Sequence, residues 1–491
     1  MRDAPARSVA GSAPVNGTVS ARLEQARQSA ASEVQGRDYN QGAFLLEHVR
    51  TSLSYSGRTD FERITTMTKP TDIGEDLVVP SRRRFLREGG ALVGGAVLAG
   101  SKASAATESA TNLPPNVPEW MKAPGDPMGG QLYGTPSPFE KGVIKNIPKD
   151  LPQYLSASGR TPLQDLDGII TPNGLFYERH HAGVPTIDPA QHRLMLHGLV
   201  DRPLIFTMDD IRRFPSKSHI YFLECSGNPN YKKPYGKTAS DLVGLLSCAE
   251  WTGVSLKLVL QEAGLQAGAK WVVAEGADAA ALTRSVPIEK CLDDAMLVYS
   301  QNGERLRPQQ GYPLRLLLPG FEGNMSVKWL RRLRVASEPT YSREETSKYT
   351  DLMPDGTARE FTFYMEAKSI ITRPSGGQRL SAPGFHEISG IAWSGHGKIR
   401  RVEVSVDDGK NWQDAQLQEP VLTRALTRFR LPWQWDGKPA VIQSRAIDET
   451  GYVQPTLAEL LAVRGENYYY HNNAIWPWRI AANGEVTNAL A

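Results

Sequence analysis

Residues 401–412 read RVEVSVDDGKNW and specify the fold of the C-terminal region. The first six residues, Arg401–Val406, alternate strictly and place three valines on one face, as in a half-buried β-strand. The Asp-Gly pair at 408–409 is the strongest short-range signal for a hairpin turn. Further strand-like runs, separated by turn residues, lie at 388–393 and 440–447. This spacing predicts an all-β sandwich of immunoglobulin type over residues 356–491.

Upstream of this sandwich, residues 167–355 alternate between strand-like and helical runs. Strand-like runs lie at 192–199, 220–223, 270–274 and 312–318, and helical runs at 238–246 and 255–263. In the second helical run, Leu256, Val259 and Leu260 repeat at i, i+3 and i+4. We therefore expect a mixed α/β domain here, and an α+β class for the whole chain. The C-terminal tail is aromatic enough to be docked on the fold: Tyr468–Tyr470, Trp476 and Trp478.

The segment 107–166 is dense in proline and glycine, which disfavours long helices and central strands. We expect an extended arm that lies over the surface and reaches a partner subunit. Residues 1–80 are rich in Ala, Ser, Gly and Arg and lack an apolar period. They are interpreted as a disordered extension or an overextended gene start.

Between these segments, residues 81–106 have the features of a twin-arginine export signal. Ser81–Leu86 reads SRRRFL, an uncharged stretch spans Gly89–Gly100, and Ala103–Ala105 offers an A-x-A cleavage site. The uncharged stretch is shorter than the roughly 20 apolar residues that span a bilayer. A twin-arginine signal predicts periplasmic export of a folded protein, commonly with its cofactor already loaded. The alternative is a glycine-rich internal helix that follows a basic turn.

Removal of residues 1–106 would leave 385 residues, enough for two domains. No other segment is apolar enough to span a membrane. A net charge of +3 without a dense basic run excludes a nucleic-acid-binding footprint. Of the three cysteines, Cys248 and Cys291 are expected to be small buried hydrophobic residues. A disulfide between these two cysteines is the alternative.

The third cysteine, Cys225, lies in the run FLECSGN at 222–228. A thiolate at the end of an apolar run, followed by small turn-forming residues, is suited to bind a soft metal. Taken alone, an isolated cysteine is more often structural.

Four blocks in order carry a resemblance to a known family: LECSGN (223–228), GFEGNMSVKWLRRLRV (320–335), VEVSVDDGKNW (402–412) and AIDETGYVQP (446–455). Over roughly residues 165–480 the chain resembles the sulfite oxidase family of molybdenum enzymes. The blocks at 114–128 and 164–185 are most similar to the bacterial sulfane (sulfite) dehydrogenases of thiosulfate oxidation.

The resemblance implies a molybdenum–molybdopterin cofactor in the first domain and a dimerisation role for the sandwich. Cys225 would then be the protein thiolate on molybdenum, next to the ene-dithiolate of the pterin. Arg179 would face the substrate, and His181 would contact the pterin. The active-site tyrosine would be Tyr349, with Tyr341 as the competitor.

Three further residues are implied in pterin binding, namely Ser326 and Lys328 at the pterin and Lys237 at its phosphate end. For Arg179, His181 and the two lysines, the alternative is a solvated surface side chain. The chain also departs from the family pattern. Pro229-Asn230 and Met325 stand where the family usually has basic residues, so we expect a pocket with less fixed positive charge. Such a pocket suits sulfane sulfur tethered to a carrier protein better than free sulfite.

The mature chain has no Cys-x-x-Cys-His motif, so we expect no haem on it. Electrons would pass to a c-type, and by resemblance dihaem, cytochrome subunit, within a heterotetramer that contains a dimer of this chain. The predicted function is periplasmic oxidation of reduced sulfur, with water as the oxygen source. The alternatives are a molybdenum sulfoxide or nitrate reductase of the same fold and a non-catalytic β-sandwich binding protein.

Overall fold

The structure, a computed structural model, describes residues 136–147, 156–229 and 235–490. All of them belong to one unit that spans Val117–Ala491. The predicted export signal, the extension before it and the block 114–128 lie outside the described residues. No helix in the described part is long and apolar enough to cross a bilayer.

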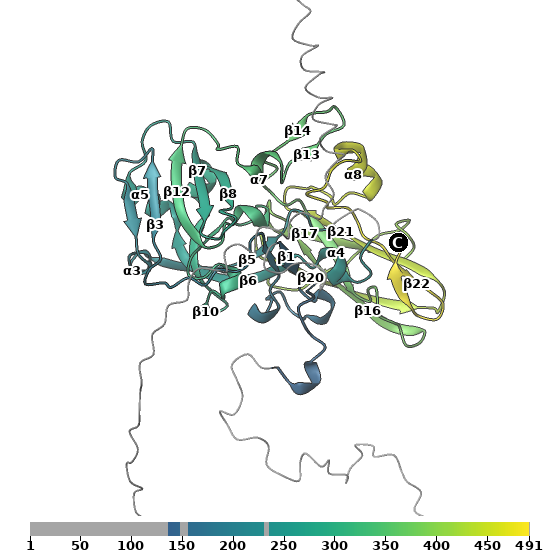
Figure 1. Cartoon of the computed structure of the whole chain (residues 1–491). Helices are drawn as coiled ribbons and strands as arrows, with labels where there is room; N and C mark the ends of the chain where they lie inside the picture. The colour runs from purple at the N-terminus through teal and green to yellow at the C-terminus, as the bar shows by residue number, and fades with distance from the viewer. Residues whose placement is uncertain (1–135, 148–155, 230–234, 491) are drawn as a thin grey trace, which may run out of the picture. The chain divides into compact units, whose positions relative to one another are not determined.

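The first domain is built on two five-stranded groups of strands (Figure 1). One runs in the order β10-β9-β6-β5, with β11 also paired to β9, and the other in the order β4-β3-β12-β7-β8. Only the pairing of β12 with β3 is parallel among these strands. Their bounds are β3 Leu194–Gly198, β4 Leu204–Phe206, β5 Ser216–Glu224, β6 Leu246–Ser255, β7 Trp271–Gly276, β8 Thr283–Pro287, β9 Met296–Gln301, β10 Glu304–Arg305, β11 Arg315–Leu317 and β12 Leu330–Ala336.

Helices in this domain are short, so strands dominate the region predicted as alternating α/β. They are α3 Met208–Arg212, α4 Ala239–Val243, α5 Leu256–Ala263, α6 Ile288–Asp293 and α7 Arg343–Thr346. The helix predicted at 255–263 is confirmed as α5, which buries Leu256, Val259 and Leu260.

Two predicted boundaries are wrong. The helix expected over 238–246 ends at Val243, because Gly244 turns the chain and Leu246 already starts β6. The strand expected over 312–318 is reduced to Arg315–Leu317. Pro313 cannot donate a ladder hydrogen bond, which explains the late start of that strand.

The arm predicted over 107–166 is described only at 136–147 and 156–166. These parts hold the 3₁₀ turns η2 (Pro138–Glu140) and η3 (Leu163–Asp165) and one short strand, β1 (Ala157–Gly159). β1 pairs antiparallel with β2 (Glu178–His180). The arm thus forms a two-stranded sheet with the segment that carries Arg179.

The C-terminal domain consists of two antiparallel sheets, as an immunoglobulin-type sandwich requires. They run in the orders β15-β16-β20-β19 and β18-β17-β21-β22-β23. The bounds are β15 Lys368–Arg373, β16 Gly384–Trp393, β17 Ile399–Ser405, β18 Gln413–Asp414, β19 Gln416–Leu417, β20 Thr427–Trp435, β21 Ala440–Asp448, β22 Trp478–Ile480 and β23 Val486–Asn488.

The hairpin predicted from residues 401–410 is present between β17 and β18. Asp408 and Gly409 both have positive φ angles, 64° and 80°, which an Asp-Gly hairpin turn favours. Val402 and Val404 are buried, whereas Val406 follows the end of the strand and is only partly buried.

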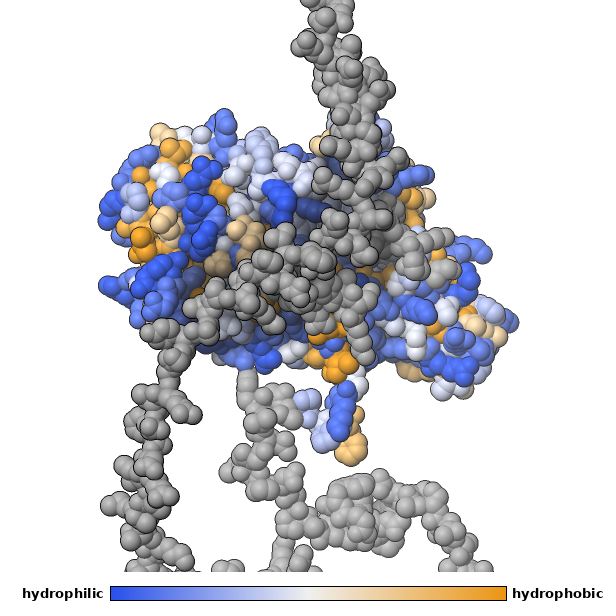
Figure 2. All heavy atoms as spheres, viewed as in Figure 1, coloured by the Kyte–Doolittle hydropathy of each residue, from blue (hydrophilic) through white to orange (hydrophobic). Residues whose placement is uncertain are grey.

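Buried apolar side chains continue from one domain into the other. A single cluster includes Phe222 and Cys248 of the first domain together with Ile370 and Trp393 of the sandwich. All three cysteines are free and buried, so Cys248 and Cys291 form no disulfide. Hydrophobic side chains that remain on the surface form separate patches among hydrophilic residues in the view of Figure 2.

A buried ion pair also joins the two domains. Lys368 Nζ of β15 donates to Glu224 Oε1 at 2.6 Å, and both side chains are almost fully buried. The indole Nε1 of Trp393 donates to the other carboxylate oxygen at 2.7 Å. Glu224 is the last residue of β5. The sandwich residues Lys368 and Trp393 therefore hold the end of that strand.

Replacement of Lys368 by methionine is expected to lower the free energy of unfolding by about 3–5 kcal/mol, since it leaves the buried charge of Glu224 uncompensated. The double variant Glu224→Gln/Lys368→Met should recover much of this loss, because no unpaired charge remains. The exposed hairpin residue Lys410, changed to methionine, is the matched control. Urea denaturation measures the effect, and equal losses for the Lys368 and Lys410 variants would contradict it.

Candidate functional site

Cys225 directly follows β5 and opens a tight turn. The Cys225 backbone N–H donates to Leu245 O at 3.0 Å. The Asn228 backbone N–H donates to Cys225 O at 3.0 Å, which closes the turn. The Asn228 side chain donates to Glu224 Oε1 at 3.1 Å, and Lys368 Nζ donates to Asn228 O at 2.9 Å. The Glu224–Lys368 pair therefore holds both ends of the cysteine turn.

The Cys225 side chain lines a cavity between the cysteine turn and the segments that carry Arg179, Lys328 and Tyr349. Six of the seven residues predicted for the site line it: Arg179, His181, Cys225, Ser326, Lys328 and Tyr349. Burial raises the pKa of the Cys225 thiol, while the positive charge of Arg179 acts in the opposite direction. The sequence analysis predicted these site residues in separate blocks of the chain. The fold brings their side chains to one cavity.

Lys237 lies elsewhere. It is exposed, it does not line the cavity, and it precedes Thr238, whose side chain caps α4. The capping box between Thr238 and Asp241 fixes this segment, and the Lys237 backbone N–H joins it by donating to Asp241 Oδ2 at 3.3 Å. The geometry thus gives Lys237 no place in the cavity.

His181 and Tyr349 meet across the cavity. His181 Nε2 lies 2.9 Å from Tyr349 Oη, although 168 residues separate them in sequence. Burial, with a further contribution from Arg179, lowers the pKa of His181 to about 4. The ring is therefore neutral at neutral pH. Burial raises the pKa of Tyr349, so its phenol also stays protonated. Tyr341, the competing candidate, is 58% exposed and does not line the cavity.

Arg179 and Lys328 bring positive charge to the same wall. Arg179 Nη1 donates to Ser156 Oγ, Ala157 O and His180 O at 3.0, 3.2 and 2.7 Å. Lys328 Nζ donates to Arg179 O and Gln309 O, both at 3.0 Å. Burial and the nearby Arg315 lower the pKa of Lys328 to about 7.

Comparison with known proteins identifies the family of the chain. A family model described as the oxidoreductase molybdopterin binding domain matches residues 181–344, and one described as the Mo-co oxidoreductase dimerisation domain matches residues 359–477. The crystal structure of the sulfane dehydrogenase SoxCD from Paracoccus pantotrophus is 46% identical, with a TM-score of 0.73, over 76% of this chain and 97% of that chain. The chain belongs to the sulfite oxidase family.

Among curated members of the sulfite oxidase family, mitochondrial sulfite oxidase from Mus musculus is 33% identical over 328 residues, which cover 61% of this chain and 60% of the relative. The NADH nitrate reductase of Volvox carteri is 29% identical over 427 residues, which cover 74% and 47%. The chain thus spans about 60% of the length of the mouse, rat and human sulfite oxidases that it matches.

The cavity lining also contains polar residues that the sequence analysis did not single out, among them Asp278, Gln310 and Arg315. Arg315 is buried, and its guanidinium donates to Gln310 O at 3.1 Å and to Ser326 O at 3.0 Å. An arginine inside the apolar run YPLRLLL at 312–318 was the available signal. No comparable pattern marks Asp278 or Gln310.

The cavity residues fit the molybdopterin cofactor of this family. Asp278 Oδ1 is buried and has no hydrogen-bond partner among the described residues. A carboxylate oxygen in that state is suited to accept from the amino-pyrimidine edge of a pterin. Cys225 supplies the one soft sulfur donor of the cavity lining, which matches a thiophilic metal. Asp278, Ser326 and Lys328 would hold the pterin, and Cys225 would hold the metal.

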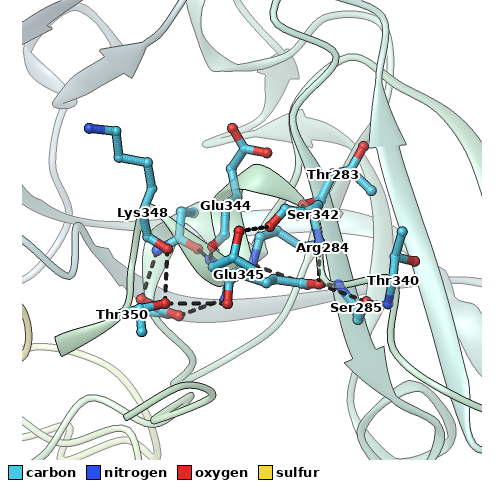
Figure 3. A network of polar contacts seen from close by, with 12 residues as sticks. Thr283, Arg284, Ser285, Thr340, Ser342, Glu344, Glu345, Lys348 and Thr350 are labelled. Atoms are coloured by element: carbon cyan, nitrogen blue, oxygen red, sulfur yellow. Dashed lines mark hydrogen bonds and ion pairs between the residues drawn. The ribbon is translucent and has the colours of Figure 1, made fainter. Parts of the chain in front are cut away.

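A buried charged network lies next to Tyr349, and Figure 3 shows the part of this network around Arg284 and Glu345. Arg284 Nη2 donates to Glu322 Oε1 at 3.0 Å, its Nη1 donates to Glu344 O at 3.0 Å, and its guanidinium carbon lies 5.3 Å from the centre of the Tyr349 ring. Figure 3 shows Arg284 beside Glu345, which accepts from the Ser285 hydroxyl at 3.1 Å. This network fixes α7 and thus the loop that carries Tyr349.

The same network reaches the cysteine turn through the C-terminal tail. The His471 backbone N–H donates to Ser226 O at 2.8 Å, and its ring nitrogens lie 3.4 Å from Glu322 and 3.6 Å from Glu366. Burial by itself would lower the pKa of His471, but the two carboxylates raise it to about 9. The ring of His471 is therefore charged at neutral pH and pairs with the two carboxylates, while its backbone binds the residue next to Cys225.

Because its pKa in the folded protein exceeds the ordinary value of 6.5, His471 contributes stability in full below about pH 6.5 and loses it as the pH rises through about 9. The shift corresponds to about 3 kcal/mol. The difference in thermal unfolding midpoint between the wild type and His471→Gln should therefore be largest near pH 6 and close by about pH 10. The exposed His396, changed to glutamine, is the control. A difference that is independent of pH would contradict the charged state.

Proposed function

We propose that this chain is a periplasmic molybdenum oxidoreductase that oxidises sulfane sulfur carried on a protein cysteine. Water would supply the oxygen, and a c-type cytochrome would accept the electrons. The observation that carries the proposal is the convergence of Cys225, Arg179, His181 and Tyr349 on one cavity, in a chain 46% identical to a sulfane dehydrogenase structure.

Each residue has a separate task in this proposal. Molybdenum bound to the pterin dithiolate would supply the two-electron redox chemistry. Cys225 anchors the metal, and Arg179 orients the sulfur substrate by charge and hydrogen bonding. Neutral His181 holds the Tyr349 hydroxyl, whose proton can be donated to an oxygen in the cavity. The Arg284 network keeps Tyr349 in place while this occurs.

The state of the cationic groups favours a tethered substrate over free sulfite. Arg315 and Lys328 direct donors to protein carbonyl groups, and Arg179 Nη1 has three protein acceptors. Met325, where the family usually has a basic residue, is buried in the apolar core and adds no charge. The donors engaged in this way are not free for a small dianion, so we expect much of the affinity to come from contacts with the carrier.

Replacement of Cys225 by serine tests the assignment of the metal ligand. The variant should fold and retain pterin, because the turn is held by Glu224, Asn228 and Lys368 and not by the sulfur. It should show no turnover above the metal-free background, and X-ray absorption should lack the protein sulfur scatterer around molybdenum. The Cys248→Ser variant is the matched control and should keep both the signal and the activity. Retained turnover by the Cys225 variant would refute the assignment.

The substrate class is tested with holoenzyme and two substrates, thiosulfate-loaded carrier protein and free sulfite. We expect kcat/KM for the loaded carrier to exceed that for sulfite by about tenfold or more, since one missing charge-assisted hydrogen bond is worth about 1.5–3 kcal/mol. Micromolar KM for free sulfite, with no turnover of the carrier, would overturn the preference. A periplasmic c-type cytochrome from the same organism, and ferricyanide, serve as acceptors.

A further inference from the structure

A second phenol, that of Tyr177, lines the same cavity as Tyr349. The backbone of Tyr177 is held on both sides, because its N–H donates to Ser247 Oγ at 2.9 Å and its carbonyl oxygen accepts from Gln310 Nε2 at 2.9 Å. The Tyr177 ring stacks on the Phe176 ring, with 5.6 Å between their centres. Tyr177 therefore has a fixed position in the cavity lining, where it is 7% exposed.

The hydroxyl group of Tyr177 lies at the cysteine turn. A Cβ atom added to Gly323 would be 2.6 Å from Tyr177 Oη and 2.7 Å from Glu224 O. Both oxygen atoms thus lie within 2.7 Å of one point, and Glu224 directly precedes Cys225. Gly323 and Cys225 line the same cavity. The hydroxyl is therefore placed beside the residue that would hold the metal.

This hydroxyl group is left without a protein partner. Within the part of the chain that the structure describes, the hydrogen bonds of Tyr177 are made by its backbone alone. The Tyr349 hydroxyl differs, because it lies 2.9 Å from His181 Nε2. Burial of a hydroxyl without a partner is unfavourable, and phenylalanine would keep the packing on Phe176 without this cost. A tyrosine at this position is therefore best explained by a bound group that accepts its hydrogen bond.

The charge state of Tyr177 determines how it can act on such a group. Burial raises the pKa of Tyr177, and a Cys225 thiolate raises it further, although Arg315 acts in the opposite direction. Burial and Cys225 also raise the pKa of Tyr349. Both phenols are therefore neutral at neutral pH, and each has one O–H group to donate.

We propose that Tyr177 is a substrate-binding residue that donates a hydrogen bond to an oxygen atom of the sulfur–oxygen group under oxidation. This inference rests on the proposed function, which makes a reduced sulfur group the occupant of the cavity. The reacting sulfur has to approach the metal, and Tyr177 lies at the Cys225 turn. Asp278 and Lys328, by contrast, would hold the pterin. Tyr177 keeps its proton and its electrons in this role, so no further reactant is required.

This role complements that of Arg179. A sulfur atom gains oxygen atoms as it is oxidised, and each oxygen atom is a hydrogen-bond acceptor. Arg179 Nη1 already has three protein acceptors, so a neutral donor on the cysteine turn supplies an additional contact. The contact adds no positive charge to the cavity. It therefore suits a partly oxidised sulfur group that remains attached to a carrier.

The kinetic test compares wild-type enzyme with the Tyr177→Phe and Tyr299→Phe variants, all full-length and loaded with molybdenum. Tyr299 on β9 is the matched control, because it is 9% exposed and does not line the cavity. We expect Tyr177→Phe to lower kcat/KM for the thiosulfate-loaded carrier about tenfold, as loss of one hydrogen bond to a charged group does. Free sulfite also presents oxygen atoms and should show a similar loss. Tyr299→Phe should remain within about twofold of the wild type.

Two measurements without turnover distinguish substrate binding from a structural role. The thermal unfolding midpoint of loaded Tyr177→Phe, without substrate, should equal or exceed that of the wild type, because no protein hydrogen bond is lost. The molybdenum and pterin contents should also equal those of the wild type. A lower midpoint would indicate a protein partner for the hydroxyl, and a lower pterin content would place it on the cofactor. Either result would overturn the proposal.

The outcomes for Tyr177 and for the proposed function can be told apart. Wild-type kcat/KM in Tyr177→Phe, for both sulfur substrates, would refute the role of Tyr177 while the proposed function stands. A wild-type enzyme that oxidises sulfite but not the loaded carrier would refute the proposed substrate, and the effect of Tyr177→Phe on sulfite would then decide the role of Tyr177. A wild-type enzyme that oxidises neither substrate would refute both.

Discussion

The buried ion pair between Glu224 and Lys368 is the constraint on which the site depends. Glu224 ends β5 one residue before Cys225, and Lys368 starts the first strand of the sandwich. Since a charge in this position is costly without its partner, the two domains are linked at the cysteine turn itself. A sandwich that assembles the dimer in this family therefore also has a direct role within one chain, because it positions the candidate metal ligand.

The cavity is surrounded by ionised groups whose partners lie far away in sequence. Arg284 comes from β8, Glu322 precedes the turn at Gly323–Met325, and His471 belongs to the tail. Such networks add little net stability compared with an apolar core, but they penalise every arrangement that leaves one member unpaired. This property suits a site in which the cysteine turn, Asn324 and Tyr349 have to keep fixed positions around a cofactor.

The electrostatics of the cavity combine a cationic wall with neutral hydrogen-bonding groups. Lys328 and Arg315 are held by carbonyl oxygens, and burial keeps His181 and Tyr349 neutral. A wall of this kind tolerates an anionic cofactor without drawing in every small anion from solution. The aromatic tail packs against Tyr349 through Tyr470 and against Gly227 of the cysteine turn through Tyr469.

Local alternation and turn chemistry were sufficient to predict the sandwich, the hairpin at 407–410 and the position of Cys225 after a strand. The long motif blocks also pointed to Arg179, His181, Ser326, Lys328 and Tyr349, all of which line the cavity. The folded chain was needed to show that Lys237 lies outside the cavity, that Asp278, Gln310 and Arg315 line it, and that Glu224 pairs with Lys368. These facts depend on contacts between residues far apart in the chain, and no local periodicity encodes such contacts.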